Sequence, residues 1–179
     1  MNDFSTIESK YLELTPRRQH LFLGACIRHA AEAFSRVAGL PDPVRQTVVE
    51  PTLSALGAAV EVDISTLTKS IESCDRVVDE LAEAEETDLQ SLAFACVTAL
   101  KILSGQEDSM SFVVDNLDEM IRLCDPDGEA GMDEEYVLRI RFLDALASSD
   151  ATDELRHLAD STLDWERRWK ADYSKSPGR

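Results

Sequence analysis

Apolar residues are densest between residues 91 and 103, where Lys101 is the only charged side chain. They occur on almost every side of a helix drawn through this stretch, which is typical of a helix that is buried on most sides. Thr87 and Gln90 stand before it at the spacing of a capping box, and Gly105 stands where such a helix would end. We therefore predict a buried central helix over residues 88–104.

Elsewhere apolar residues recur every three or four positions, which is the period of one face of a helix. The segments with this pattern are 3–14, 16–38, 42–62, 66–83, 109–124, 133–148 and 152–173. Pro51 lies inside the third of these segments, where it either kinks a helix or divides it in two. Asp63, Ser65 and Thr66 are the candidate caps of the helix that follows.

No stretch alternates apolar and polar residues in the manner of a strand, and no repeat is visible. The fold class we expect is all-α: a single-domain antiparallel bundle of about six to eight helices around the helix at residues 88–104. Residues 15–173 would form this domain. A lead-in at residues 1–14 would precede it, and a flexible tail at residues 174–179 would follow it.

The composition is that of a globular protein. Hydrophobic residues make up 44% of the 179 residues, which is enough to build a core. No apolar run approaches the roughly 18 to 20 residues that span a bilayer, and the first residues lack the pattern of a signal peptide. The four cysteines lie in predicted helices without a C-x-x-C pair, which favours buried thiols in a reducing compartment over disulfides. We expect a cytoplasmic protein.

The net charge of −17 is concentrated in the middle of the chain. Residues 72–135 hold 19 acidic and three basic residues, whereas the segments on either side are nearly neutral. Such a charge disfavours binding to nucleic acid and to anionic membranes, because both require a basic face. Two interpretations remain open: the acidic surface keeps the protein in solution, or it docks a basic protein partner.

Short connections favour antiparallel neighbours, so alternate turns of the bundle should lie at the same end. The turn near residue 85 and the turn near residue 127 would then meet, and both are acidic. If this end binds a partner, the candidate residues are Glu83, Glu85, Glu86, Asp88, Asp125, Asp127, Glu129, Asp133 and Glu134.

Trp165 and Trp169 alternate with Arg167, Arg168 and Lys170 near the end of the chain. Aromatic side chains next to arginine are common at protein interfaces, so the two tryptophans are secondary partner-binding candidates. The alternative is that they fasten the last helix to the core while the basic residues face the solvent.

Residues that could carry catalysis or bind a metal are sparse. Glu154 and His157 have the E-x-x-H spacing of di-iron bundles, but a second copy of the motif is missing. The acidic segment that begins at Asp125 lacks the residues that a calcium loop requires at its sixth and twelfth positions. The sequence contains no G-x-S-x-G and no phosphate loop. We therefore expect no catalytic residue, no metal site and no cofactor.

Two segments, taken together, resemble a known family. Residues 17–29, RRQHLFLGACIRH, are similar to the opening helix of the YjaG-like family of small, acidic, all-helical bacterial proteins of unassigned function. Residues 88–100, DLQSLAFACVTAL, resemble its central helix, and the order and spacing look similar over residues 12–170. The WERRW segment at residues 165–169 and the acidic helix around residue 75 depart from the pattern. The resemblance implies an all-helical fold and supplies no catalytic residues.

Several helical immunity families of bacterial toxin systems have the same general character: compact, acidic and without a catalytic motif. We therefore expect a non-enzymatic protein-binding protein of the immunity type, an inhibitor whose acidic surface occludes the active site of a basic toxin or effector. Two alternatives stay open. One is a structural or adaptor protein that forms a homodimer, and the other is a carrier of a small ligand within the bundle.

Overall fold

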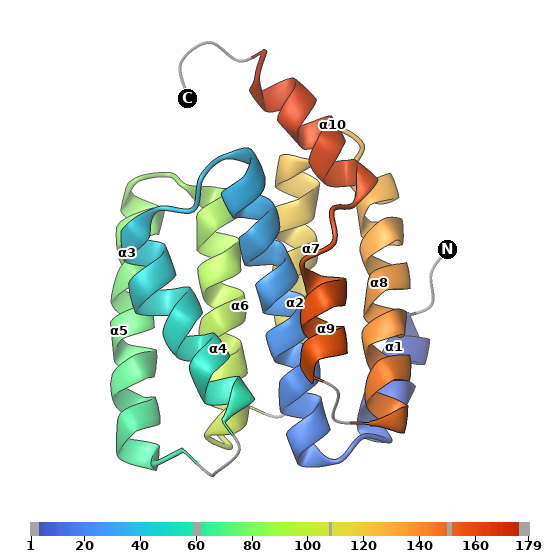
Figure 1. Ribbon diagram of the computed structural model, residues 1–179. Helices are drawn as coiled ribbons and strands as arrows, with labels where there is room; N and C mark the ends of the chain where they lie inside the picture. Colours follow the sequence, from blue (N-terminus) through green and yellow to red (C-terminus); the bar gives the residue numbers. More distant parts are fainter. Residues whose placement is uncertain (1–3, 59–61, 108, 150–151, 176–179) are drawn as a thin grey trace.

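The computed structural model describes residues 4–58, 62–107, 109–149 and 152–175. Every regular element in these residues is a helix, so the predicted all-α bundle is confirmed (Figure 1). The elements in chain order are α1 (Phe4–Leu12), α2 (Pro16–Val37), α3 (Asp42–Val44), the π-helix η1 (Arg45–Val49), α4 (Glu50–Gly57), α5 (Ile64–Glu83), α6 (Thr87–Leu103), α7 (Ser111–Cys124), α8 (Gly128–Ser148), α9 (Thr152–Ala159) and α10 (Asp164–Tyr173). Residues 1–3 of the predicted lead-in and residues 176–179 of the predicted tail lie outside the described residues.

Two helices, α2 and α6, share the centre of the bundle. α2 packs against α1, η1, α4, α6, α7, α8, α9 and α10, while α6 packs against α2, η1, α4, α5 and α7. Leu92, Cys96 and Leu100 of α6 have no exposed surface, which agrees with the predicted central helix. One stripe of α6 nevertheless faces outward, and Phe94 on this stripe keeps 41% of its surface exposed.

Helices α5 to α8 run alternately up and down the bundle, as their short connections predict (Figure 1). The α5–α6 and α7–α8 turns lie at the upper end in this view, and the end of α6 and the start of α7 lie at the lower end. Neighbours in sequence are also neighbours in space, because α5 packs on α6, α6 on α7 and α7 on α8. Among the described residues, no helix combines the length and the apolar content that crossing a membrane requires.

The two ends of α6 differ in how well they were predicted. Gly105 adopts φ 74°, and its amide donates a hydrogen bond of 3.0 Å to the carbonyl of Ile102, so the helix ends as the glycine predicts. At the other end the N-cap is Glu86 instead of Thr87, and no side chain caps the helix. The predicted capping box is wrong because Glu85 turns into the left-handed region, at φ 59°, and starts the helix one residue early.

Pro51 neither divides nor ends its helix. α3, η1 and α4 follow one another without a break, and the π-helical turn of η1 comes just before the proline. Because proline has no amide hydrogen, the carbonyl of Thr47 lacks an α-helical partner, and the Cys74 thiol donates to it over 3.5 Å. The hydroxyl of Thr52 donates to the carbonyl of Val48 at 2.7 Å. The wider turn and these two side chains let the helix continue through Pro51.

α8 begins at Gly128, whereas the sequence predicts a start at residue 133. The two glycines of this segment indicated a break, but the structure uses them for close packing. A Cβ atom on Gly128 would lie 3.1 Å from the Cα of Arg122, and one on Gly131 would lie 2.6 Å from Asp125 Oδ2. A side chain would be tight at Gly128 and would displace a neighbour at Gly131. Both glycines belong to the helix, and only residues 125–127 form the turn.

The last predicted helix, residues 152–173, is wrong as a single element, because residues 160–163 separate α9 from α10. Glu166 accepts a hydrogen bond from the amide of Leu163 at 2.9 Å and so caps α10. The hydroxyl of Ser161 donates to the last turn of α9 at 2.6 Å. The apolar stripe continues through residues 160–163, so the sequence pattern does not show that α9 ends and α10 begins there. The bend lets α10 pack on both α2 and α8 at the upper end of the bundle (Figure 1).

Candidate functional site

The turn between α5 and α6 carries acidic side chains that face the solvent. Glu83, Glu85 and Glu86 are exposed, and Asp88 is partly buried in the first turn of α6, where it accepts a hydrogen bond from the Leu89 amide at 2.9 Å. The first turn of a helix carries partial positive charge, so acidic residues are favourable there. In the part of the chain that the structure describes, none of the three glutamates forms an ion pair. Their carboxylates are therefore free to meet a partner.

The turn between α7 and α8 is acidic too, but two of its acids serve the fold. The Asp125 side chain is completely buried, and Arg168 of α10 donates to both of its oxygens, at 3.0 and 2.7 Å. Arg168 also donates to Glu134 at 2.9 Å, and Glu134 accepts the amide of Trp165 at 3.0 Å. The bonds to Asp125 and Glu134 raise the pKa of Arg168. Asp125 and Glu134 thus hold α10 in place and do not face a partner.

The other three acids of this turn, Asp127, Glu129 and Asp133, are exposed. Glu129, Asp133 and Asp118 line a cavity of about 470 Å³ between α1, α7 and α8. Arg139 also lines this cavity, and its guanidinium lies 2.6 Å from Asp118. Among the described residues, three acids and one cation line this cavity, and such an excess of acids favours a basic side chain.

The two tryptophans are buried, so neither can anchor a partner. Trp165 is 0% and Trp169 is 5% exposed, and their rings stack with centroids 5.8 Å apart. Trp169 meets Phe34 of α2 edge to face at 5.1 Å, and the Trp165 indole donates to Glu135 of α8 at 3.1 Å. Both side chains fasten α10 to the bundle, which is the alternative that the sequence left open.

A buried cluster of charged side chains, which sequence reasoning missed, joins α2, α8 and α10. His29 of α2 has Nδ1 at 2.7 Å from Glu135 Oε1 and Nε2 at 3.4 Å from Glu166 Oε1. Arg36 Nε lies 2.8 Å from Glu166 Oε2. His29, Glu135 and Glu166 are each at most 3% exposed. No local pattern reveals this cluster, because its members lie far apart in the chain and meet only in the folded bundle.

The pKa values of the cluster follow from these contacts. Burial alone would lower the pKa of His29, but Glu135 and Glu166 outweigh burial and raise it to about 9. Burial alone would raise the pKa of both glutamates, and the neighbouring cations, His29 foremost, lower it instead. His29 is therefore a cation between two anions at neutral pH. A substrate cannot reach a completely buried group, so we assign the cluster to fastening α10 and not to catalysis.

The four cysteines are buried thiols, as the sequence predicts. Burial raises the pKa of Cys26 to about 12 and that of Cys74 to about 11, and it also raises the pKa of Cys96. Such thiols are poor nucleophiles at neutral pH. Within the described residues, no group of three or more His, Cys, Asp and Glu side chains is arranged to hold a metal ion.

Exposed apolar side chains lie on the outer face of α6 and α7. Phe94, Phe112 and Leu123 are 41%, 51% and 49% exposed. The ion pair of Asp118 with Arg139 of α8 identifies the side of α7 that faces α8. By helical periodicity Phe112 and Leu123 lie away from that side, toward α6 and the outward stripe that carries Phe94. Leu123 is one residue from the end of α7 and therefore close to the acidic turns.

Comparison of the chain with models of protein families, with curated proteins and with solved structures gave no match. The resemblance to the YjaG-like family and to helical immunity proteins therefore stays a prediction.

Proposed function

We propose that this chain is a non-enzymatic protein-binding protein whose acidic end receives a basic protein partner. The observation that supports this most is the contrast within the acidic end. Asp125 and Glu134 are paired inside the fold, whereas Glu83, Glu85 and Glu86, at a short turn between long helices, are exposed and form no ion pair with any described residue. The short turn fixes the backbone of these glutamates, so a partner does not have to order a long loop on binding.

The proposed acidic docking surface combines charge with apolar anchors. Its acidic residues are Glu83, Glu85, Glu86, Asp88, Asp127, Glu129 and Asp133, and its apolar residues are Phe94 and Leu123. The acids would steer a basic partner and speed its association, and the apolar side chains would supply affinity once they are buried. The acidic cavity beside Glu129 and Asp133 gives a basic side chain of the partner a place to enter.

The mode of action we propose is occlusion by an immunity-type inhibitor. A basic toxin or effector that acts on an anionic substrate has a cationic active site, and an acidic protein surface can cover that site. This mode requires no catalytic group on the inhibitor. It also accounts for the buried, poorly nucleophilic thiols and the enclosed His29.

The test is capture of a partner from lysate of the native host. The immobilised protein is washed at low salt and eluted with about 1 M salt, where the Debye length falls to roughly 3 Å, and the eluate is identified by mass. A single stoichiometric basic protein is the expected result, and its own activity is then assayed with and without this chain. Loss of that activity at equimolar ratio is the outcome that inhibition requires.

A matched pair of variants tests where binding occurs. One variant carries Glu83→Lys, Glu85→Lys and Glu86→Lys, and the control carries three exposed changes elsewhere, Glu8→Lys, Glu13→Lys and Glu154→Lys. Both change the net charge equally. Only the first should weaken the captured complex, by roughly tenfold or more, because local complementarity is lost. Equal weakening by both variants would show that net charge alone drives binding and would contradict the docking surface.

A homodimer through the outer face of α6 and α7 is the second candidate function, and the exposed Phe94, Phe112 and Leu123 favour it. Two copies that each carry a net charge of −17 repel one another, so the apolar contact has to outweigh a repulsion that is strongest at low salt. Light scattering at low and high salt separates the candidates. A dimer that persists at low salt, together with an empty capture eluate, would favour the homodimer.

A further inference from the structure

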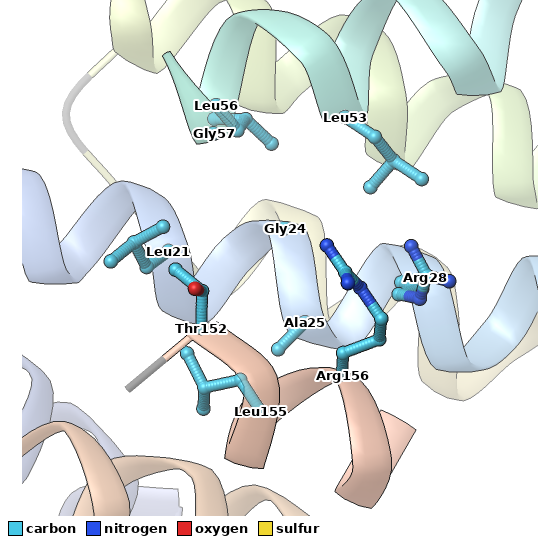
Figure 2. Close-up of a pocket in the computed structure, with 10 residues that line it drawn as sticks. All are labelled: Leu21, Gly24, Ala25, Arg28, Leu53, Leu56, Gly57, Thr152, Leu155 and Arg156. Atoms are coloured by element: carbon cyan, nitrogen blue, oxygen red, sulfur yellow. The ribbon is translucent and has the colours of Figure 1, made fainter. Parts of the chain in front are cut away.

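A cavity of about 310 Å³ lies between α2, α4 and α9 (Figure 2). It is far from the acidic turns, because α9 and the first half of α2 lie toward the opposite end of the bundle (Figure 1). The volume is at the lower end of the range of roughly 300 to 1,000 Å³ that small-molecule sites occupy. No residue of the acidic docking surface lines it.

Most of the cavity wall is apolar, and the reason is visible in the sequence of α2. Gly24 has no side chain and Ala25 has only a methyl group, so α2 leaves a depression between α4 and α9. Leucines close the hollow from three elements: Leu21 from α2, Leu53 and Leu56 from α4, and Leu155 from α9 (Figure 2). A Cβ atom on Gly24 would meet Leu56 Cβ at 3.6 Å, an ordinary contact, so the glycine is not required for packing.

Two arginines from different helices line this hollow. Figure 2 shows the side chains of Arg28, from α2, and Arg156, from α9, on the same side of the cavity. Arg28 Nε bonds to Asp160 at 3.1 Å, and Arg156 Nη1 lies 3.6 Å from Asp153. Neither aspartate lines the cavity. Among the described residues, the wall contains two cations and no anion, in a chain whose net charge is −17.

Each guanidinium keeps nitrogens that donate to no described residue, and a carboxylate in the cavity can accept hydrogen bonds from both arginines. Guanidinium groups suit carboxylates because the planar donors match both oxygens. The leucines beyond the arginines then suit an aliphatic chain attached to the carboxylate. A purely inorganic anion would leave the leucine wall unused, and a neutral alkane would leave the remaining guanidinium donors unused.

We propose that this cavity binds a small amphipathic anion, a carboxylate with a short aliphatic chain. The carboxylate lies between Arg28 and Arg156, and the chain lies along Gly24 and Ala25 among the leucines. This site is independent of the proposed function at the acidic end, since the two share no residue and lie at different ends of the bundle.

The first experiment compares probes that share a chain and differ in the head group. Octanoate, octylammonium and 1-octanol are titrated into the full chain at about 0.15 M salt, by calorimetry and by NMR of the amides around Gly24. Octanoate should bind one site with a dissociation constant below about 1 mM, and octylammonium should bind at least roughly tenfold more weakly. Equal binding of the two ions, or no saturation by octanoate, would overturn the proposal.

Variants then assign binding to the cavity. Arg28→Gln with Arg156→Gln should weaken octanoate by roughly tenfold or more and leave 1-octanol unchanged, because only the charged contact is lost. Gly24→Leu fills the hollow and should abolish binding of both. Gly24→Ala, which fits without a clash, and Arg167→Gln, on exposed surface of α10, are the controls for folding and for net charge. If the double glutamine variant, folded by circular dichroism, still prefers octanoate over octylammonium, the arginines do not form the site.

Discussion

The α5–α6 turn and the α7–α8 turn lie at the same end of the bundle (Figure 1). Both are rich in acids, yet their acidic side chains differ in exposure and in ion pairing. At the first turn the glutamates are exposed and without ion-pair partners among the described residues. At the second, Asp125 is buried and held by Arg168. The cause is α10, which packs on α8 and α2 and brings a cation to one turn only. An acidic cluster in a sequence is therefore a candidate surface only where no later helix covers it.

The largest change in stability should follow from removing Arg168, the cation that pairs with Asp125 at the α7–α8 turn. Arg168→Ala leaves the buried Asp125 carboxylate with the Asp127 amide but without its cation, and we expect a loss of about 2 to 4 kcal/mol in the free energy of unfolding, somewhat less than for a fully buried pair. Arg167→Ala, which removes an exposed pair with Asp164, should change stability by no more than about 0.5 kcal/mol. Urea denaturation measures both, and equal midpoints would mean that Arg168 does not hold α10.

The second prediction concerns the pH dependence of the buried cluster. Because the pKa of His29 is raised to about 9, its protonated form stabilises the fold fully below its ordinary value of 6.5, and this contribution is lost as the pH rises through about 9. We expect a loss on the order of 2 kcal/mol over that interval. Glu135 and Glu166 have lowered pKa values, so their contribution is present above the ordinary 4.5 and is lost as the pH falls.

Urea midpoints between pH 4 and pH 10 test this linkage. His29→Asn should lower stability at neutral pH and flatten the profile between pH 6.5 and pH 9. The matched control is His157→Asn, because His157 is exposed and should leave the profile unchanged. An unaltered alkaline limb in His29→Asn would place the titrating group elsewhere.

The third prediction tests the close packing at the α7–α8 turn. Gly131→Ala would place a Cβ atom 2.6 Å from Asp125 Oδ2 and 3.1 Å from Trp165 Cβ, so the ion-paired carboxylate has to move. We expect a loss of about 1 to 2 kcal/mol from this overpacking, although alanine is the better helix former. Gly57→Ala is the control, because nothing lies within 4 Å of its added Cβ. Thermal melts compare the two, and a stabilised Gly131→Ala would show that the turn adapts easily.

The smallest change in stability is expected at the α5–α6 turn, and there it is a gain instead of a loss. Glu85 adopts φ 59°, a conformation that glycine tolerates better than glutamate. Glu85→Gly should therefore raise the free energy of unfolding by about 0.5 to 1 kcal/mol while it weakens capture of a basic partner. A gain in stability without any loss of binding would remove Glu85 from the docking surface.

The helices could largely be predicted, because their apolar period is a local property of the chain. The periodicity gave α2 and α6 nearly to the residue, and the up-and-down order then brought the two acidic turns to one end. The start of α8 was missed because Gly128 and Gly131 meet neighbours that are distant in sequence or lie across the turn. The break at residues 160–163 was missed because the apolar stripe continues through it.

The candidate site was less accessible to sequence reasoning, since pairing decides which charges stay free. Nothing near Asp125 in the sequence indicates that Arg168 covers it. His29 and Glu135 likewise meet only because α2 and α8 pack together. Arg28 of α2 and Arg156 of α9 line one cavity, and the local sequence of neither helix indicates this. Long-range packing supplied each of these contacts.

The four buried cysteines can be used to measure local opening of the fold. Cys26, Cys74, Cys96 and Cys124 lie on α2, α5, α6 and α7, one on each helix. A thiol-alkylating reagent can reach such a side chain only when the surrounding packing opens, so the rate at each site measures the free energy of that opening. Mass spectrometry of timed alkylation would thus rank these helices by how often they come loose, without any engineered label.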